Sequence, residues 1–151
     1  MDLLDVFDNR VLIACMSAWS LVQVLKLPIE YLISRRWNWS LLFRAGGMPS
    51  SHTALVTSVA HAIGLTSGFD SGLFALSVVM AMVVIYDATG IRRQAGRHAE
   101  IINTIVQDLV EGHPLRQEQL REVLGHSPLE ALVGLLIGVG VAQIVVALLP
   151  V

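Results

Sequence analysis

Three short polar clusters hold most of the side chains in this 151-residue chain that could do chemistry. The first is Gly46–Thr53 (GGMPSSHT), the second is Tyr86–Gly96 (YDATGIRRQAG), and the third is Gly125–Glu130 (GHSPLE). Their histidines, arginines, hydroxyls and carboxylates are groups that bind an oxyanion or transfer protons. Each cluster borders an apolar stretch, so the arrangement of those stretches must decide whether the three clusters meet.

The first cluster has the features of an anion-binding loop. Gly46 and Gly47 supply a flexible backbone, Pro49 stands near a helix start, and hydroxyl residues follow it. The free amides at the start of a helix point toward an anion. A capped helix with a glycine-rich lead-in would use the same residues, and this cluster alone does not separate the two interpretations.

The other two clusters pair carboxylates with cations. Asp87 ends an apolar stretch, where an unpaired carboxylate is costly, so we expect it to support the site by contacting an arginine or a histidine. The adjacent Arg92 and Arg93 suit a phosphate or anionic lipid headgroups. Glu130 follows His126 by four residues, which places both on one face of a helix. A carboxylate there fixes the tautomer of a nucleophilic or acid–base histidine, and a structural helix cap is the alternative.

The composition places these clusters in a membrane protein. Apolar residues make up 54% of the chain and charged residues only 15%, whereas a soluble protein of this size needs more polar surface. The formal net charge of −2 does not favour a nucleic acid as partner. We expect an all-α, polytopic bundle of transmembrane helices, with residues 1–151 forming a single integral membrane domain.

About four membrane spans are expected. In chain order they are Val11–Leu25, Thr53–Leu65, Ser71–Tyr86 and Leu129–Leu149. The short connection Thr66–Asp70 predicts a hairpin between the second and third spans. Ser127 and Pro128 predict the N-cap and first residue of the last span. Gly134 and Gly138 predict a seam where another helix approaches closely, although chance spacing in a glycine-rich helix is the alternative.

Two long polar connections, Lys26–His52 and Asp87–Pro128, must fall on the same side of a four-span bundle. They contain nine of the ten basic residues. The positive-inside rule therefore predicts a cytoplasmic site face, both termini outside, and a location in the cell (plasma) membrane. Apolar residues at helical spacing over Ile101–Leu109 predict an amphipathic helix on the membrane interface or against the bundle. A second short helix is predicted over Arg116–Leu124.

Together the clusters predict one phosphate site at one membrane face. Two histidines, two or three arginines, a lysine and a loop of hydroxyls and amides would meet there. Cations and amides hold phosphate oxygens, while histidines transfer protons or the phosphoryl group itself. Such a site needs no metal and no cofactor.

The segments GGMPSSHTA, YDATGIRRQAG and GHSPLEALVG, in this order and spacing, resemble the divergent branch of the type 2 phosphatidic acid phosphatase and vanadium haloperoxidase superfamily. The resemblance covers nearly the whole chain from Lys26 onward. It implies a metal-independent phosphatase that hydrolyses the phosphomonoester or pyrophosphate of a lipid, either an isoprenoid or a glycerolipid. The reaction would pass through a phosphohistidine.

The resemblance also implies a role for each matching residue. Ser50 and the amide of Ser51 would bind phosphate, and His52 would act as the general acid. His126 would be the nucleophile, oriented by Glu130 where the family has an aspartate. Water would then release phosphate from the histidine.

The cations depart from the family pattern. The family's first motif has lysine and arginine seven apart, whereas Ile33 stands seven residues after Lys26; its last motif has an arginine where this chain has Leu120. We expect Lys26 to bind phosphate and Arg92 and Arg93 to supply the missing cation. The chain has fewer spans than six-helix lipid phosphatases, so a homodimer is one way to close the site.

Two other functions fit the same residues. A non-enzymatic membrane protein would bind anionic lipid headgroups or a partner through the basic face. A small transporter needs a polar group at mid-depth, and only His61 offers one. His61 is better explained by packing against neighbouring helices or a hydrogen bond to a backbone carbonyl.

Overall fold

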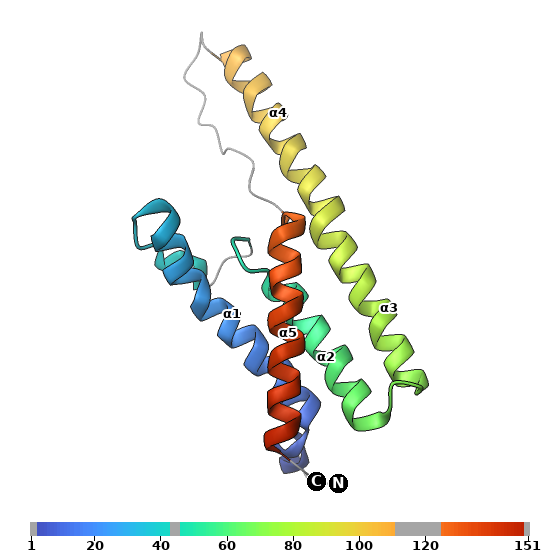
Figure 1. The fold of residues 1–151 in the computed structure, drawn as a ribbon. Coiled ribbons are helices and arrows are strands. Elements are labelled where there is room, and N and C mark those ends of the chain that lie inside the picture. Colours follow the sequence, from blue (N-terminus) through green and yellow to red (C-terminus); the bar gives the residue numbers. More distant parts are fainter. Residues whose placement is uncertain (1–2, 43–45, 111–124, 150–151) are drawn as a thin grey trace.

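The computed structural model describes residues 3–42, 46–110 and 125–149, and within these ranges it is helical with no strand. The long helices are α1 (Arg10–Ser34), α2 (Ser51–Ser67), α3 (Gly72–Tyr86), α4 (Arg92–Val110) and α5 (Pro128–Leu148) (Figure 1). Two 3-10 helices, η1 (Leu3–Asp8) and η2 (Trp39–Leu42), flank α1, and a π-helical turn, η3 (Asp87–Ile91), joins α3 to α4. The predicted all-α bundle is confirmed.

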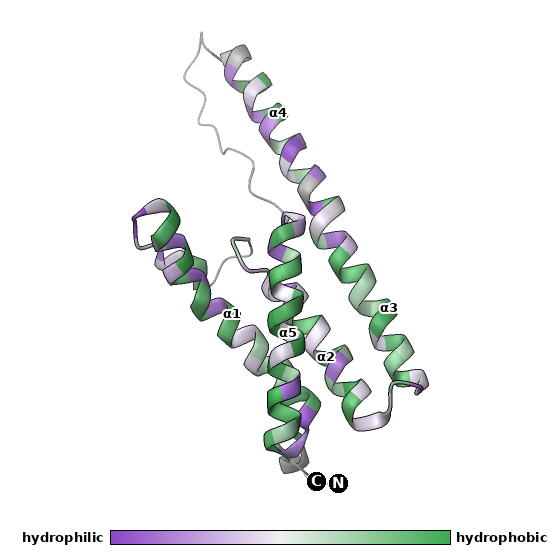
Figure 2. Cartoon of the chain, viewed as in Figure 1, coloured by the Kyte–Doolittle hydropathy of each residue, from purple (hydrophilic) through white to green (hydrophobic). Residues whose placement is uncertain are grey.

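Within the described residues, three helical segments are long and apolar enough to cross a membrane: α1, the continuous stretch Gly72–Gln107, and α5. Figure 2 shows apolar residues along α3 and α5 and more polar residues along α4. The expected span over residues 53–65 lies in α2, which has only 17 residues. α2 packs against α1, α3 and α5, so it forms the centre of the bundle and buries its own hydroxyl residues.

The helix starts follow caps that the sequence encodes. The side chains of Asn9, Ser50, Ser71 and Ser127 each accept a hydrogen bond from a backbone N–H in the first turn of α1, α2, α3 and α5. The predicted N-cap and first residue of the last helix are thereby confirmed. The predicted hairpin is also present, because α2 ends at Ser67 and α3 begins at Gly72.

The seam predicted in the last helix is the contact of α5 with α2. A Cβ atom on Gly134 would overlap the Ser50 carbonyl oxygen. A Cβ atom on Gly138 would overlap the Ala54 carbonyl oxygen and the Thr57 hydroxyl. Only glycine allows this approach, so the seam sets how closely the start of α5 lies against the start of α2.

We therefore expect Gly138→Ala to lower the free energy of unfolding by about 1–3 kcal/mol, because the new methyl group meets backbone atoms that cannot rotate away. Gly140→Ala is the matched control, since a Cβ atom there meets nothing within 4 Å. Thermal unfolding of both variants in detergent measures the difference. Equal melting temperatures would contradict a tight seam.

The helical backbone does not stop where α3 ends at Tyr86. Backbone hydrogen bonds continue through η3, so the helix continues into α4. α4 extends away from the bundle (Figure 1). α4 is amphipathic as predicted, but it follows the direction of α3 and does not turn onto the bundle. Its apolar side chains from Ile101 to Leu109 are exposed. The short helix predicted over Arg116–Leu124 lies outside the described residues.

The elements that carry the polar clusters gather at one end of the bundle. The second half of α1, the start of α2, η3 and the start of α5 lie there (Figure 1). At the other end, the Arg10 guanidinium donates to the Leu149 carbonyl at 3.2 Å, which joins the start of α1 to the end of α5.

Candidate active site

A backbone hydrogen bond joins the start of α2 to the start of α5. Gly46 and Gly47 have φ angles of 107° and 77°, which are strained for any other residue and shape the loop that leads into α2. The Ser50 N–H then donates to the Glu130 carbonyl at 3.1 Å. The sequence segments around Ser50 and Glu130 are thus adjacent in space although 80 residues separate them.

Ser50 is fully buried and caps α2. Its hydroxyl oxygen accepts from the Thr53 N–H at 3.3 Å and from the Thr53 hydroxyl at 3.0 Å. A hydroxyl accepts two hydrogen bonds and donates one, so the Ser50 proton is still free to bond a phosphate oxygen. The cap and the anion loop, which the sequence posed as alternatives, are compatible.

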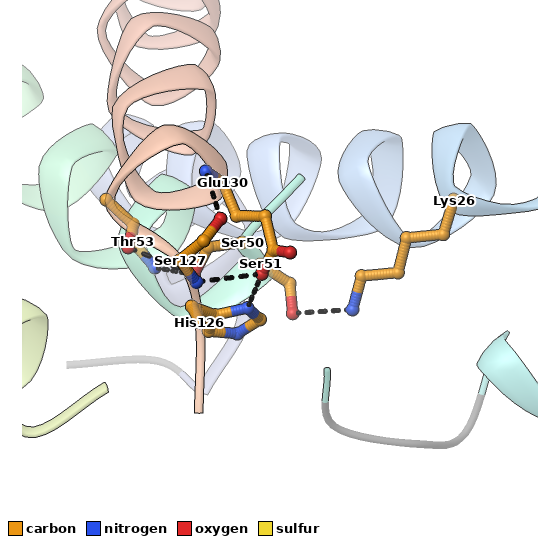
Figure 3. Close-up of polar contacts among 7 residues, drawn as sticks. All are labelled: Lys26, Ser50, Ser51, Thr53, His126, Ser127 and Glu130. Carbon is orange, nitrogen blue, oxygen red and sulfur yellow. Dashed lines mark hydrogen bonds and ion pairs between the residues drawn. The ribbon is translucent and has the colours of Figure 1, made fainter. Parts of the chain in front are cut away.

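Lys26 reaches this loop from α1. The side chain is only 1% exposed, and Nζ donates to the Ser51 hydroxyl at 3.3 Å (Figure 3). An ammonium group has three N–H donors, and burying one without an anion costs free energy. The position of Lys26 beside the first residue of α2 therefore favours an anion at this point.

His126 is held at its backbone and at its ring. Its N–H donates to the Ala88 carbonyl of η3 at 2.8 Å, and its Nδ1 lies 2.9 Å from Glu130 Oε2 (Figure 3). In a neutral ring, the contact with Glu130 places the proton on Nδ1 and leaves the lone pair on Nε2. The same Glu130 oxygen accepts the Ser127 N–H at 3.2 Å. Glu130 therefore acts as helix cap and as histidine partner at once.

His52 faces the ring of His126 and lines a pocket. The two ring centroids are 6.2 Å apart, so one phosphate group can contact both rings. The pocket has a volume of about 340 Å³ and is lined by His52, Val83, Val84, Asp87, Ala88 and Arg92. Arg92 Nε donates to Asp87 Oδ2 at 2.6 Å, which is the pairing expected for a carboxylate in this position.

The residues predicted for the site form two neighbouring groups. The first group is joined by hydrogen bonds and consists of Lys26, Ser50, Ser51, His126 and Glu130. The second group lines the pocket and consists of His52, Asp87 and Arg92. The two histidine rings connect them. Arg93 lies in the first turn of α4, and its side chain is outside the described part of the structure. Within that part, no three His, Cys, Asp or Glu side chains form a potential metal site.

Two residues of this arrangement were missed from the sequence. Thr53 bonds the Ser50 hydroxyl, and its spacing of three residues from Ser50 at a helix start was a usable signal. Ala88 contributes only a backbone carbonyl, for which no side chain gives a signal. His61 contacts a neighbouring helix, as one of its two interpretations predicted: Nε2 lies 3.0 Å from the side-chain oxygen of Gln143 on α5.

Residues 7–141 match the model of a protein family described as the Divergent PAP2 family. An uncharacterized membrane protein of Bacillus subtilis (strain 168), YuiD, is 39% identical to this chain over 147 residues, which cover 90% of this chain and 93% of that protein. No solved structure matches the chain.

Proposed function

We propose, from the premise that this chain belongs to the Divergent PAP2 family of membrane proteins, that it hydrolyses the phosphomonoester or pyrophosphate of a membrane lipid. The observation that carries the proposal is the setting of His126. Its buried ring is bonded to Glu130 at 2.9 Å, and the ring of His52 lies 6.2 Å away beside a pocket. This set supplies a nucleophile, its orienting carboxylate and an acid.

In the first step, Nε2 of His126 attacks phosphorus. The N–P bond forms while the bond from phosphorus to the leaving oxygen breaks, and His52 in its protonated form gives its proton to that oxygen. Burial and the nearby His126, Arg92 and Lys26 lower the pKa of His52, so acidic pH favours this form. Glu130 stabilises the positive charge that develops on the His126 ring. The products are the free lipid alcohol, or a lipid monophosphate if the substrate is a pyrophosphate, and a phosphohistidine.

In the second step, water attacks the phosphohistidine. Neutral His52 takes a proton from the water as the O–P bond forms and the N–P bond breaks. Inorganic phosphate leaves, His126 recovers its lone pair, and His52 is protonated again for the next cycle. Side chains perform every proton transfer in this scheme.

Cations and helix-start donors would hold the phosphate oxygens. Lys26 lies at the first turn of α2, where the Ser51 amide and the Ser50 hydroxyl proton can also point at an anion. Arg92 bonds Asp87 through Nε, which leaves its two Nη groups for phosphate. Arg93 belongs to the same turn and is a further candidate.

The pocket wall favours a lipid over a water-soluble phosphate ester. Val83 and Val84 of α3 line the pocket, and Val79, Met80 and Val83 are exposed on the same helix. A phosphate bound beside His52 would thus have its apolar chain next to the hydrocarbon phase. We propose that the site face is cytoplasmic, at the cell membrane, and that a second copy of the chain completes the helix packing around the pocket.

The second candidate function is binding of anionic headgroups without catalysis. The amphipathic α4, with Arg92 and Arg97 exposed near the bundle and apolar side chains beyond them, favours it. A surface of this kind binds anionic lipid whether or not the histidines react.

A phosphate-release screen separates the two functions. Purified protein in detergent should release inorganic phosphate from at least one prenyl phosphate, phosphatidate or phosphatidylglycerol phosphate, and EDTA should not change the rate. The His98→Ala variant, altered at an exposed residue of α4, controls for activity lost during expression and purification of a variant. If no substrate yields phosphate while the protein still binds vesicles of anionic lipid, the headgroup-binding function is correct.

A further inference from the structure

The π turn between α3 and α4 changes which carbonyl accepts the hydrogen bond of a backbone N–H inside the helix. The Arg92 N–H donates to the Asp87 carbonyl, five residues back. In an α-helix it would donate to Ala88, four residues back. Ala88 is buried, with 3% exposure, and its carbonyl instead accepts the His126 N–H at 2.8 Å.

We propose that η3 positions His126 for the reaction, with Ala88 as a positioning residue that acts through its carbonyl oxygen. This inference rests on the proposed function and adds the element that aims its nucleophile. A buried carbonyl needs a hydrogen-bond donor. In the π turn the Arg92 N–H, which would bond Ala88 in an α-helix, bonds Asp87 instead, and the backbone of His126 donates to the Ala88 carbonyl.

His126 needs such an anchor because it precedes α5. It lies one residue before the N-cap Ser127, so no helical hydrogen bond orients its backbone. Its two described attachments are the Ala88 carbonyl at the N–H and Glu130 at Nδ1. With only the Glu130 contact, the ring could pivot around Nδ1, and Nε2 would lose its fixed direction.

The Asp87–Arg92 ion pair allows a selective test. Residues five apart in an α-helix lie about 140° apart around the axis, so they do not face each other. The π turn brings Asp87 and Arg92 to 2.6 Å. Deleting one residue between them would make them four apart, and an α-helix also brings that spacing together. The deletion therefore gives the Ala88 carbonyl an α-helical donor that competes with the His126 N–H, while it keeps the ion pair.

Deletion of Gly90 should convert η3 to regular α-helix. We expect kcat to fall about 100-fold, because His126 is misaligned, with KM little changed because the phosphate-holding cations stay in place. Deletion of the exposed Ala95 is the matched control. It also shortens and rotates the outer part of α4, but it leaves η3 whole, so kcat should stay near that of the wild type.

A second readout does not depend on catalysis. Hydrogen exchange at the His126 amide should be slow in the wild type and in the Ala95 deletion, and faster in the Gly90 deletion. Thr89→Val is a milder variant that keeps the chain length. It removes the hydroxyl that donates to the Ile85 carbonyl at 2.7 Å, a contact that loosens regular helical geometry. It should give a smaller change of the same sign in both exchange and kcat.

The two readouts separate failure of the inference from failure of the proposed function. Wild-type exchange and kcat in either the Gly90 deletion or Thr89→Val would overturn the role of η3. If the Gly90 deletion does not fold, Thr89→Val decides. If the wild type releases no phosphate from any lipid, the proposed function fails, while fast exchange at the wild-type His126 amide would still refute the anchor by itself.

Discussion

His126→Gln is expected to lower the rate of phosphate release by at least about 10⁴-fold, the scale of loss when a nucleophile is removed from a catalytic set that acts as a unit. Glutamine can still bond Glu130, so the packing at the start of α5 should survive. It has no ring nitrogen to form the N–P bond, and the reaction loses its intermediate. Steady-state phosphate release and trapping of the phosphoenzyme under alkaline conditions measure the two effects.

The control is the same substitution at His61, a histidine of α2 that does not line the pocket. His61 bonds Gln143, so His61→Gln changes a comparable side chain without touching the phosphate. It should keep the wild-type rate and the phosphoenzyme. A phosphoenzyme that still forms in His126→Gln would assign the nucleophile to another residue.

His52→Gln should have the second-largest effect, and its size should depend on the leaving group. With a lipid alcohol leaving, we expect kcat to fall about 10²–10⁴-fold, because the alkoxide departs without a proton. With a nitrophenol leaving group, which departs as an anion by itself, the loss on the first step should be much smaller. Single-turnover rates of phosphoenzyme formation with the two classes of ester measure the difference.

An equal loss with both leaving groups would contradict the acid role. It would instead indicate that His52 only shapes the pocket beside Asp87 and Arg92. The His98→Ala variant should show the wild-type ratio of the two rates. The test compares two rates measured on the same variant, one for each class of ester. Differences between variants in the fraction of active protein therefore cancel.

In the proposed site, Lys26 would favour an anion even before a ligand arrives. An ammonium group that is 1% exposed is costly in an apolar bundle, although the Ser51 hydroxyl accepts from it at 3.3 Å and the Glu130 carboxylate attracts it. The free amides at the start of α2 carry a partial positive charge, so they also attract an anion. Under the proposed function, a phosphate bound between them would stabilise both.

Local signals in the sequence predicted the parts of the site that depend on near neighbours. Ser127 followed by Pro128, and Glu130 three residues after the cap, specify the start of α5 and the contact of Glu130 with His126. Gly134 and Gly138 predicted the seam with α2. These features succeed because hydrogen bonds at a helix start and spacing along a helix face are set within one or two turns.

The course of the chain after Tyr86 was not predictable in the same way. Asp87 and Gly90 end the apolar pattern, and polar residues with a glycine are typical of a helix end. The helix instead continues through a π turn, because backbone N–H groups in the turn still donate to carbonyls inside the helix. A helix needs only these hydrogen bonds, so α4 can extend beyond the apolar part of the bundle. Hydrophobic periodicity reports where lipid ends, and it does not report where a helix ends.

The sequence by itself determined the membrane class, the helix starts and the identity of the groups that could handle phosphate, since these follow from composition and short spacings. Only the tertiary structure decided that Lys26 reaches Ser51, that the His52 and His126 rings lie 6.2 Å apart, and that Ala88 anchors His126. The physical reason is that these contacts join α1, α2, η3 and α5, and the packing of α1, α3 and α5 on α2 sets where these elements lie. A backbone carbonyl such as that of Ala88 becomes a functional group only once the helices that surround it are in place.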